Sequence, residues 1–434
     1  MRAKSFTLES TEPEQVRAVA AAIRSLAEQP PDVAGTVAGI LADVRERGDE
    51  AVLDLTRRFD TDVVPERTRV EPGQLDEALA GLDSEVRAGL DTAIANVRRV
   101  AEAEVLDDVA VELPEGHTIT LRELPVARAG VYVPGGRAAY PSTVVMCCVP
   151  ARVAGVEQVA VATPPGPDGR PRDTILAACR LCNVDEVFLM GGAQAVAALA
   201  YGTASVAPVD VIVGPGNPYV QEAKRQLAGA VVGIDSVAGP TELLIVADAQ
   251  ADAGMVALDL AAQAEHGPDS VVAMASPDGA VLEAVAEAAA RLSAERPTVQ
   301  DAPLALVHTP TMDAAIEVAN AFAPEHLELA CGDAARLAGL VTASGCVFIG
   351  GGAAFGDYAA GSNHVLPTGG AARFSGPLGA STFRRRQALV SLPESAVRAL
   401  APHVSSVARA EGFPVHAESA EARAGSPGSS GNRT

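Results

Sequence analysis

The sequence of 434 residues lacks the long apolar runs of a membrane protein. No stretch of about 18 uninterrupted apolar residues occurs, so we expect no membrane-spanning helix and no membrane partner. The first residues, MRAKSFTLESTEPEQ, turn polar and acidic where a secretory signal peptide needs an apolar segment. These two absences predict a cytoplasmic protein.

Basic residues are also scarce. The chain has 33 Lys and Arg against 55 Asp and Glu, a formal charge of −22, and no basic stripe compensates. A strongly acidic chain repels phosphate backbones, so we expect no nucleic acid partner. Apolar residues make up 48% and charged residues 20%, which is a globular composition. The length allows about two to four domains with a large buried core.

Cysteine is rare, with six residues. In a long cytoplasmic chain, we expect these thiols to be reduced and buried. Cys179 and Cys182 form a C-x-x-C pattern, but it lies inside an amphipathic helical segment, TILAACRLC, and no second pair accompanies it. Ordinary packing therefore explains this pattern better than redox chemistry or zinc binding does.

Helical periodicity dominates both ends of the chain. Residues 1–128 read mainly as helices before a switch to short β-rich runs, and we expect this part to pack with residues 241–377. Residues 378–423 read as a helical tail without a sheet of its own, which must pack on the body or on a partner chain. Residues 424–434 read as a disordered end.

Between these ends, apolar strands alternate with helices. Segments such as QVAVAT, EVFLMGG and DVIVGPGN form one series, and ELLIVAD, SVVAMAS and LALVHTP form a second. This alternation predicts an α/β fold with two Rossmann-like domains, residues 129–240 and 241–377, each with a parallel sheet. We expect ligands at the carboxyl ends of the strands. No G-x-G-x-x-G follows a strand; the nearest glycine-rich turns are GGAQA, GPGNP and GGGAAFGD.

Four segments carry residues suited to chemistry. NAFAPEHLELA places Glu325 beside His326 just after Pro324, where a preceding helix should end. Such a pair is more often a solvated surface step, and each of the other segments is also weak alone. These others are QAEHGPDS with Gln263 and His266, GDYAAGSNHVLPTGG with Asp357 and His364, and EGFPVHAES with Glu411 and His416.

Taken together and in order, the motifs resemble the histidinol dehydrogenase family. The resemblance spans residues 15–420 and is carried by GVYVPGGRAAYPSTV, GGAQAVAALAYGT, VIVGPGNPYVQEAK, IDSVAGPTELL, QAEHGPDS, FAPEHLEL, GDYAAGSNHVLPTGG and EGFPVHAES. It implies an NAD-dependent four-electron oxidation of L-histidinol to L-histidine through an aldehyde-level intermediate, the last step of histidine biosynthesis. It also implies one zinc ion per subunit, two incomplete Rossmann-like domains and a homodimer with composite active sites.

The resemblance assigns roles to individual residues. Glu325 and His326 match the catalytic pair. An imidazole suits repeated proton exchange, so we expect His326 to be the proton acceptor and Glu325 to activate water for the second oxidation. Tyr132, Gln194 and Asn217 match NAD contacts. The zinc ligands implied are Gln263, His266, Asp357 and His416. The substrate contacts implied are Thr241, Gln263, His266, Glu325, His326, Asp357, His364, Glu411 and His416.

One departure from the family pattern is visible at Thr241, where the family has serine; threonine keeps the hydroxyl and adds a methyl. Cys147 and Cys148 stand where apolar residues are expected, and we assign them no catalytic role. Two alternatives compete. A sulfopropanediol dehydrogenase-like enzyme would keep the alcohol oxidation but not the full ligand set. A zinc-stabilised interaction protein would not need the Glu325–His326 pair.

Overall fold

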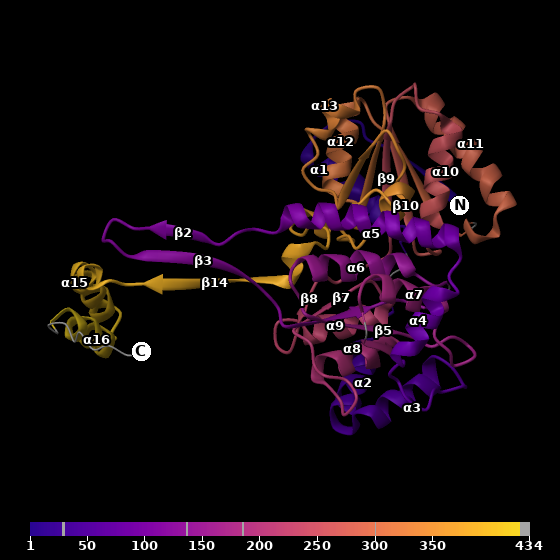
Figure 1. The fold of residues 1–434 in the computed structure, drawn as a ribbon. Coiled ribbons are helices and arrows are strands. Elements are labelled where there is room, and N and C mark those ends of the chain that lie inside the picture. Colours follow the sequence, from indigo (N-terminus) through magenta and orange to yellow (C-terminus); the bar gives the residue numbers. More distant parts are fainter. Residues whose placement is uncertain (28–30, 136–137, 185, 300, 426–434) are drawn as a thin grey trace. The chain divides into compact units, whose positions relative to one another are not determined.

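The computed structural model describes residues 1–27, 31–135, 138–184, 186–299 and 301–425. It divides into two compact units (Figure 1). The larger unit comprises Met1–Glu104 and Val126–Phe383, and the smaller unit comprises Val105–Pro125 and Arg384–Thr434. The larger unit contains two parallel sheets, which confirms the α/β class. We call the part around residues 129–240 the first half and the part around 241–377 the second half.

The first half contains a five-stranded parallel sheet in the order β6-β5-β4-β7-β8. Its short strands consist mainly of buried aliphatic residues, as expected for a sheet covered on both faces. The strands are β4 (Arg128–Tyr132), β5 (Gln158–Thr163), β6 (Glu186–Leu189), β7 (Val211–Val213) and β8 (Gly233–Ile234). The helices between them are α6 (Pro141–Val153), α7 (Asp173–Leu181), α8 (Gly192–Tyr201) and α9 (Pro218–Leu227).

The second half contains a six-stranded parallel sheet in the order β1-β11-β10-β9-β12-β13. Helices α10 and α11 cover one face, and α1, α12 and α13 cover the other (Figure 1). The strands are β1 (Arg2–Thr7), β9 (Glu242–Ala247), β10 (Val271–Ser276), β11 (Pro303–His308), β12 (His326–Ala330) and β13 (Cys346–Ile349). The helices are α1 (Pro13–Arg24), α10 (Ala253–Ala264), α11 (Gly279–Glu295), α12 (Met312–Phe322), α13 (Ala334–Ala338) and α14 (Ala353–Tyr358).

The two sheets have the same strand order. Counted along the chain, β4 to β8 and β9 to β13 are each arranged 3-2-1-4-5, the order of the first five strands of the doubly wound dinucleotide-binding fold. In the second sheet, β1 extends the edge beside β11. The remaining elements of the larger unit are α2 (Ala34–Arg47), α3 (Asp49–Phe59), α4 (Pro72–Ala80), α5 (Ser84–Glu104), η1 (Pro297–Val299), η2 (Ala371–Arg373) and η3 (Ala380–Phe383).

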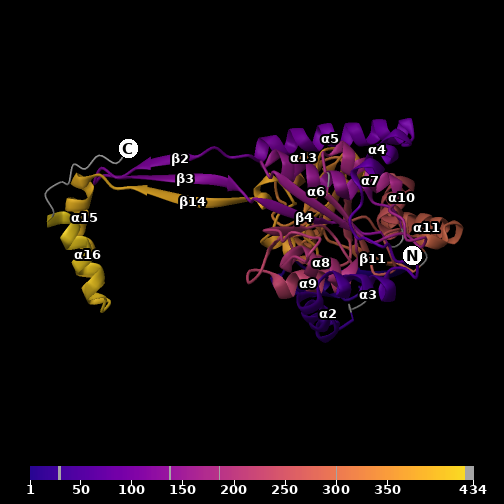
Figure 2. The same cartoon turned by 60° about the horizontal axis from the view of Figure 1, so that its bottom comes forward.

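The packing of the N-terminal part differs from the expectation that residues 1–128 join residues 241–377. Strand β1 and helix α1 lie on the second half, whereas α2 and α3 pack on α8, and α4 packs on α7. Helix α5 runs beside α6 (Figures 1 and 2). The physical reason is one shared core, in which Val37, Ile40, Val44 and Leu55 pack with apolar residues of the first half.

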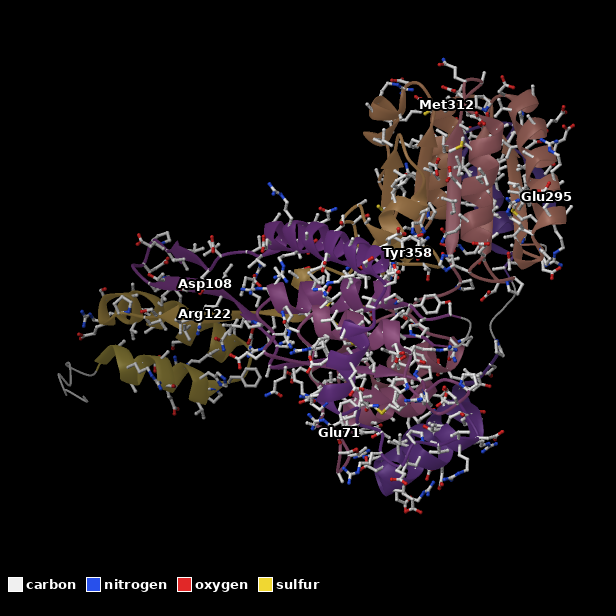
Figure 3. The ribbon with its side chains drawn as sticks, turned by 45° about the vertical axis from the view of Figure 1, so that its right-hand side comes forward. Glu71, Asp108, Arg122, Glu295, Met312 and Tyr358 are labelled. Carbon is white, nitrogen blue, oxygen red and sulfur yellow. The ribbon has the colours of Figure 1, made fainter. Side chains whose placement is uncertain are left out.

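The smaller unit corrects the expectation of a tail without a sheet. Strand β14 (Arg384–Ser391) pairs antiparallel with β3 (Thr118–Pro125), which pairs with β2 (Val109–Glu112). The polar start RRRQ hid this strand, because both of its faces are exposed. Figure 3 labels Asp108 and Arg122, whose side chains lie 3.8 Å apart at this small sheet. Helices α15 (Glu394–Ala410) and α16 (Pro414–Gly425) pack on each other.

Three further expectations can be compared with the described residues. None of their helices is long and apolar enough to cross a membrane. Cys147, Cys148, Cys179 and Cys182 are buried free thiols, as predicted, whereas Cys331 and Cys346 are only partly buried, which corrects the expectation for these two. Helix α16 continues to Gly425, so the expected disordered end at 424–434 begins too early, and its remainder lies outside the described residues.

Candidate active site

A cavity of about 760 Å³ lies within the larger unit and is lined by both of its halves. The first half contributes residues at the carboxyl ends of its strands, including Tyr132 at the end of β4 and Asn217 after β7. The second half contributes residues at the amino ends of its strands, including Thr241 before β9 and His326 at the start of β12. On the second half, the cavity therefore lies at the amino ends of the strands, opposite to the ends where we expect ligands.

The Glu325–His326 pair faces this cavity because α12 stops early. The helix ends at Phe322, and Ala323 adopts a left-handed conformation with φ of 49° immediately before Pro324. This break confirms the predicted helix end and leaves Glu325 on irregular backbone just before β12. Both side chains line the cavity although Glu325 is only 7% and His326 only 2% exposed.

The main chain of Glu242 holds both members of the pair. Its N–H donates to Glu325 Oε2 at 3.0 Å, and its carbonyl oxygen lies 3.3 Å from His326 Nδ1. Strands β9 and β12 are neighbours in parallel register, which brings these groups together. The Glu242 side chain is buried and forms an ion pair with Arg24 of α1. Burial raises the pKa of Glu242 to about 7, against the opposing effect of Arg24.

Sequence reasoning missed Glu242 and Arg24. The available signal was the acid at the start of ELLIVA, since a carboxylate that opens a fully buried strand needs a partner.

His326 also lies beside Asp357 of α14, with Nε2 3.2 Å from Oδ1. Burial lowers the pKa of His326, but the carboxylates of Glu325 and Asp357 outweigh burial and raise it to about 10. Burial raises the pKa of Asp357, but its hydrogen bond with His326 and the nearby imidazoles hold it below its usual value. The two groups thus stabilise each other's charged forms.

Three of the four expected metal ligands line the cavity. Gln263 and His266 lie at the end of α10, and Asp357 lies on α14. Figure 3 shows Tyr358, the neighbour of Asp357, at the edge of the second half that faces the first. The Gln263 side-chain nitrogen donates to Thr241 Oγ1, which in turn donates to Glu325. Within the described ranges, no three His, Cys, Asp or Glu side chains form a group that could hold a metal ion.

The bonds of Thr241 explain why threonine can replace serine. Its hydroxyl links Gln263 to the Glu325 carboxylate, and a serine hydroxyl could do the same. His364 is held nearby, with Nδ1 2.8 Å from the Asp357 carbonyl oxygen and Nε2 3.3 Å from Thr143 Oγ1. Burial lowers the pKa of His364, which favours the neutral imidazole.

The three expected NAD contacts also line the cavity. The Tyr132 hydroxyl accepts the Gly192 N–H at 3.1 Å, and burial raises the pKa of Tyr132 to about 12. Gln194 is almost fully buried and donates from Nε2 to Asp60 Oδ2 at 3.0 Å. Asn217 Oδ1 accepts the N–H groups of the first turn of α9 and so acts as its N-cap.

A buried ion pair fixes the turn that follows β7. Lys224 Nζ lies 2.5 Å from Asp235 Oδ1 and donates to the Gly214 carbonyl at 2.9 Å. Asp235 Oδ2 accepts the Gly214 N–H at 2.8 Å. Gly214 has φ of 114°, and a Cβ there would stand 2.2 Å from the Tyr132 carbonyl oxygen. Sequence reasoning missed this pair, although Lys224 falls on the apolar stripe of α9 beside Val220 and Leu227.

Glu411 and His416 lie in the smaller unit, at the end of α15 and in α16. The cavity lining described above belongs to the larger unit. The structure therefore gathers every expected site residue except these two into one cavity: Tyr132, Gln194, Asn217, Thr241, Gln263, His266, Glu325, His326, Asp357 and His364.

Comparisons with known proteins show which family this chain resembles. The family model described as histidinol dehydrogenase matches residues 23–424. The histidinol dehydrogenase of Thermobifida fusca is 45% identical over 395 residues, covering 88% of this chain and 90% of the relative. That of Mycobacterium tuberculosis is 46% identical over 404 residues, covering 89% and 90%. A crystal structure of the enzyme from Elizabethkingia anophelis, 28% identical, covers 97% of each chain with a TM-score of 0.89. The chain belongs to the histidinol dehydrogenase family.

Proposed function

We propose that this protein is a cytoplasmic L-histidinol dehydrogenase that oxidises L-histidinol to L-histidine with two NAD, the last step of histidine biosynthesis. The observation that carries the proposal is the Glu325–His326 pair, held by the main chain of Glu242 and facing a cavity that also contains Gln263 and Asp357. The free thiols of all six cysteines fit a reducing compartment.

His326 is the proton acceptor for the alcohol. The Glu242 carbonyl oxygen can only accept a hydrogen bond, so it fixes the proton of the neutral imidazole on Nδ1. Nε2 is then the atom that takes the hydroxyl proton. The Asp357 carboxylate lies beside Nε2 and helps to raise the pKa of His326 to about 10. Binding of this carboxylate to a metal ion would weaken that effect and lower the pKa of His326.

Glu325 activates water in the second oxidation. Its Oε2 is fixed by the Glu242 N–H and by the Thr241 hydroxyl, so the carboxylate is oriented before substrate enters. A buried, hydrogen-bonded carboxylate beside His326 can accept a proton from water that adds to the aldehyde. Gln263 donates to the Thr241 hydroxyl and so holds that hydroxyl in place beside the carboxylate.

Three residues of the cavity fit zinc, which leaves one of its four ligand positions to be filled. Zinc accepts nitrogen and oxygen ligands, and this cavity offers the imidazole of His266, the carboxylate of Asp357 and the amide oxygen of Gln263. Because the Gln263 nitrogen donates to Thr241, the amide oxygen is the end that is left to bind a metal. Zinc would supply a Lewis acid that fixes the imidazole and amine of the substrate. The resemblance implies His416 as the fourth ligand, and in the proposed homodimer it would be supplied by the partner subunit.

NAD fits the first half of the larger unit. NAD supplies the hydride acceptor of both oxidations. Tyr132 and Asn217 flank the switch point between β4 and β7, where dinucleotides bind in this strand order. The turns at Gly192 and Gly214 bring backbone close to the cavity without a G-x-G-x-x-G pattern.

The smaller unit supports a homodimer with composite sites. Its buried apolar side chains among the described residues are only Ala396, Ala401, Ala408 and Ala417. Such a core is too small for a stand-alone domain. Exposed apolar surface of this extent marks an interface. The exposed side chains are Leu106, Val109, Val111, Leu389, Val390, Leu392, Val404, Val407, Phe413 and Val415.

The reaction is tested by stoichiometry. Purified protein is given limiting L-histidinol and excess NAD, and absorbance at 340 nm is followed with and without a chelator. Two NADH per histidinol, abolished by the chelator and restored by zinc, is the expected result. One NADH per substrate, or turnover indifferent to chelation, would contradict the four-electron or the zinc assignment.

Composite sites are tested by complementation. An inactive His326→Ala chain is mixed with an inactive His416→Ala chain, and subunits are allowed to exchange. One of the two sites in each mixed dimer should then carry neither defect, so activity should reappear. If mass spectrometry confirms mixed dimers and no activity returns, each site is built within one chain.

A further inference from the structure

The first half lacks an acid where the doubly wound fold normally supplies one. In that fold, an Asp or Glu beyond the second strand binds the ribose hydroxyls of NAD. The second strand here is β5, and the residues that follow it are Pro164, Pro165, Gly166 and Pro167. The next residue, Asp168, is exposed, and its Oδ1 accepts the Arg170 N–H in a local turn. Asp168 therefore does not serve the cavity.

A different acid reaches this place from the N-terminal part. Asp60 follows α3, which packs on α8, and its carboxylate lines the cavity. A Cβ built on Gly191 would stand 2.5 Å from Asp60 Oδ1 and 2.9 Å from Pro164 Cβ. The carboxylate thus lies against the carboxyl ends of β5 and β6, beside the prolines.

The surroundings of Asp60 orient it. Its Oδ2 accepts the Gln194 side-chain N–H at 3.0 Å, and the Gly191 N–H also donates to the carboxylate. Burial raises the pKa of Asp60 to about 6, so the group is still mainly anionic above neutral pH. No cation is paired with it among the ion pairs of the described residues. Its charge therefore acts on whatever occupies the cavity.

We propose that Asp60 is the carboxylate that accepts the adenosine ribose hydroxyls and makes the enzyme select NAD over NADP. The strands β4, β5 and β6 form the complete mononucleotide half of this sheet, which holds the adenosine in the doubly wound fold. A 2′-phosphate placed there would meet the anionic carboxylate in a partly buried site. Arg172 also lines the cavity, but it is exposed, and its charge is screened by solvent.

This inference rests on the proposed use of NAD, and its test separates the two. Binding of NAD and of NADP to the zinc-loaded protein is measured by calorimetry without substrate. The variants are Asp60→Asn, which keeps the shape and loses the charge, and Asp60→Ser, which keeps an acceptor for Gln194. Asp62→Asn is the matched control, because Asp62 is exposed and does not line the cavity. Thermal unfolding without ligand checks that each variant is folded.

Wild type should bind NAD more tightly than NADP. Each Asp60 variant should lose roughly tenfold in NAD affinity, since a charged acceptor is replaced by a neutral one. The ratio of NADP to NAD dissociation constants should fall by at least about tenfold, and Asp62→Asn should leave it unchanged. An unchanged ratio in both folded Asp60 variants overturns the role of Asp60, whatever the change in melting temperature. If wild type binds neither dinucleotide, the proposed function itself is wrong.

Discussion

Replacing Lys224 by methionine tests whether the buried Lys224–Asp235 ion pair stabilises the turn at Gly214 after β7. Lys224 is fully buried, and among the described residues its ammonium interacts with the Asp235 carboxylate and the Gly214 carbonyl oxygen. Methionine fills a similar volume but leaves Asp235 as a buried charge without its partner. Breaking a buried pair in this way costs about 3–5 kcal/mol of unfolding free energy.

A double-mutant cycle measures the interaction free energy between Lys224 and Asp235. Asp235→Asn keeps an acceptor for the Gly214 N–H but leaves the Lys224 ammonium unpaired, so it should also cost about 3–5 kcal/mol. The double variant contains neither charge. If the two losses were independent, their sum would be about 6–10 kcal/mol. We expect the double variant to lose at least about 2 kcal/mol less than this sum, because the groups are in contact.

The assay is urea unfolding followed by circular dichroism at one protein concentration, since subunit association is linked to stability. Arg225→Met is the matched control, because Arg225 is the next residue on α9 and its bond to Glu222 is on the surface. Its effect should stay within about 1 kcal/mol. Additive losses in the cycle, or a Lys224→Met loss no larger than that of the control, would refute the reasoning.

Four further predictions concern the site. His326→Ala should abolish alcohol oxidation while zinc content, measured by elemental analysis, stays normal; lost zinc would make His326 a structural residue. Glu325→Gln should slow oxidation of the aldehyde more than oxidation of the alcohol, and equal losses in separately measured half-reactions would leave Glu325 only a positioning role. Chelation should stop turnover without loss of helical circular dichroism, because the two halves have large cores of their own. Glu242 has a folded pKa of about 7 against an ordinary 4.5, so wild type binds the extra proton only when folded and loses stability as pH rises between these values. The unfolding free energy of Glu242→Gln relative to wild type should therefore rise by about 3 kcal/mol from pH 5 to pH 8, with Glu317→Gln as an exposed control showing no such rise.

Much of the fold could be predicted from the sequence because its strands are short, apolar and separated by helices. Segments such as QVAVAT and SVVAMAS become β5 and β10 with nearly complete burial. The strands β1 and β14 were missed for a physical reason: both are edge strands with polar, exposed side chains. Their pairing depends on partners far away in the chain, at β11 and β3, which local periodicity cannot reveal.

The site could be predicted only where a motif carried it. Glu325 and His326 stood out because two titratable side chains follow a proline that ends a helix. Glu242 and Lys224 did not stand out, because their roles depend on burial and on main-chain partners. Asp60 reads as one more acid at the end of a charged helix until the fold places α3 against α8. Long-range packing, rather than residue type, places these three side chains beside the cavity or its turns.

The two sheets have the same strand order, but the first contributes the carboxyl ends of its strands to the cavity and the second contributes the amino ends. This difference explains why the two halves are proposed to bind different groups. The carboxyl edge of the first sheet ends in glycine turns and helix starts, which suit a dinucleotide. The amino edge of the second sheet presents side chains instead, since Glu242 and His326 begin the adjacent strands β9 and β12. In that ladder His326 pairs with Leu243, so a slip of one residue would turn the imidazole away from the Glu242 carbonyl. The positions of Glu325 and His326 are thus set by strand register, while the proposed NAD contacts lie at turns.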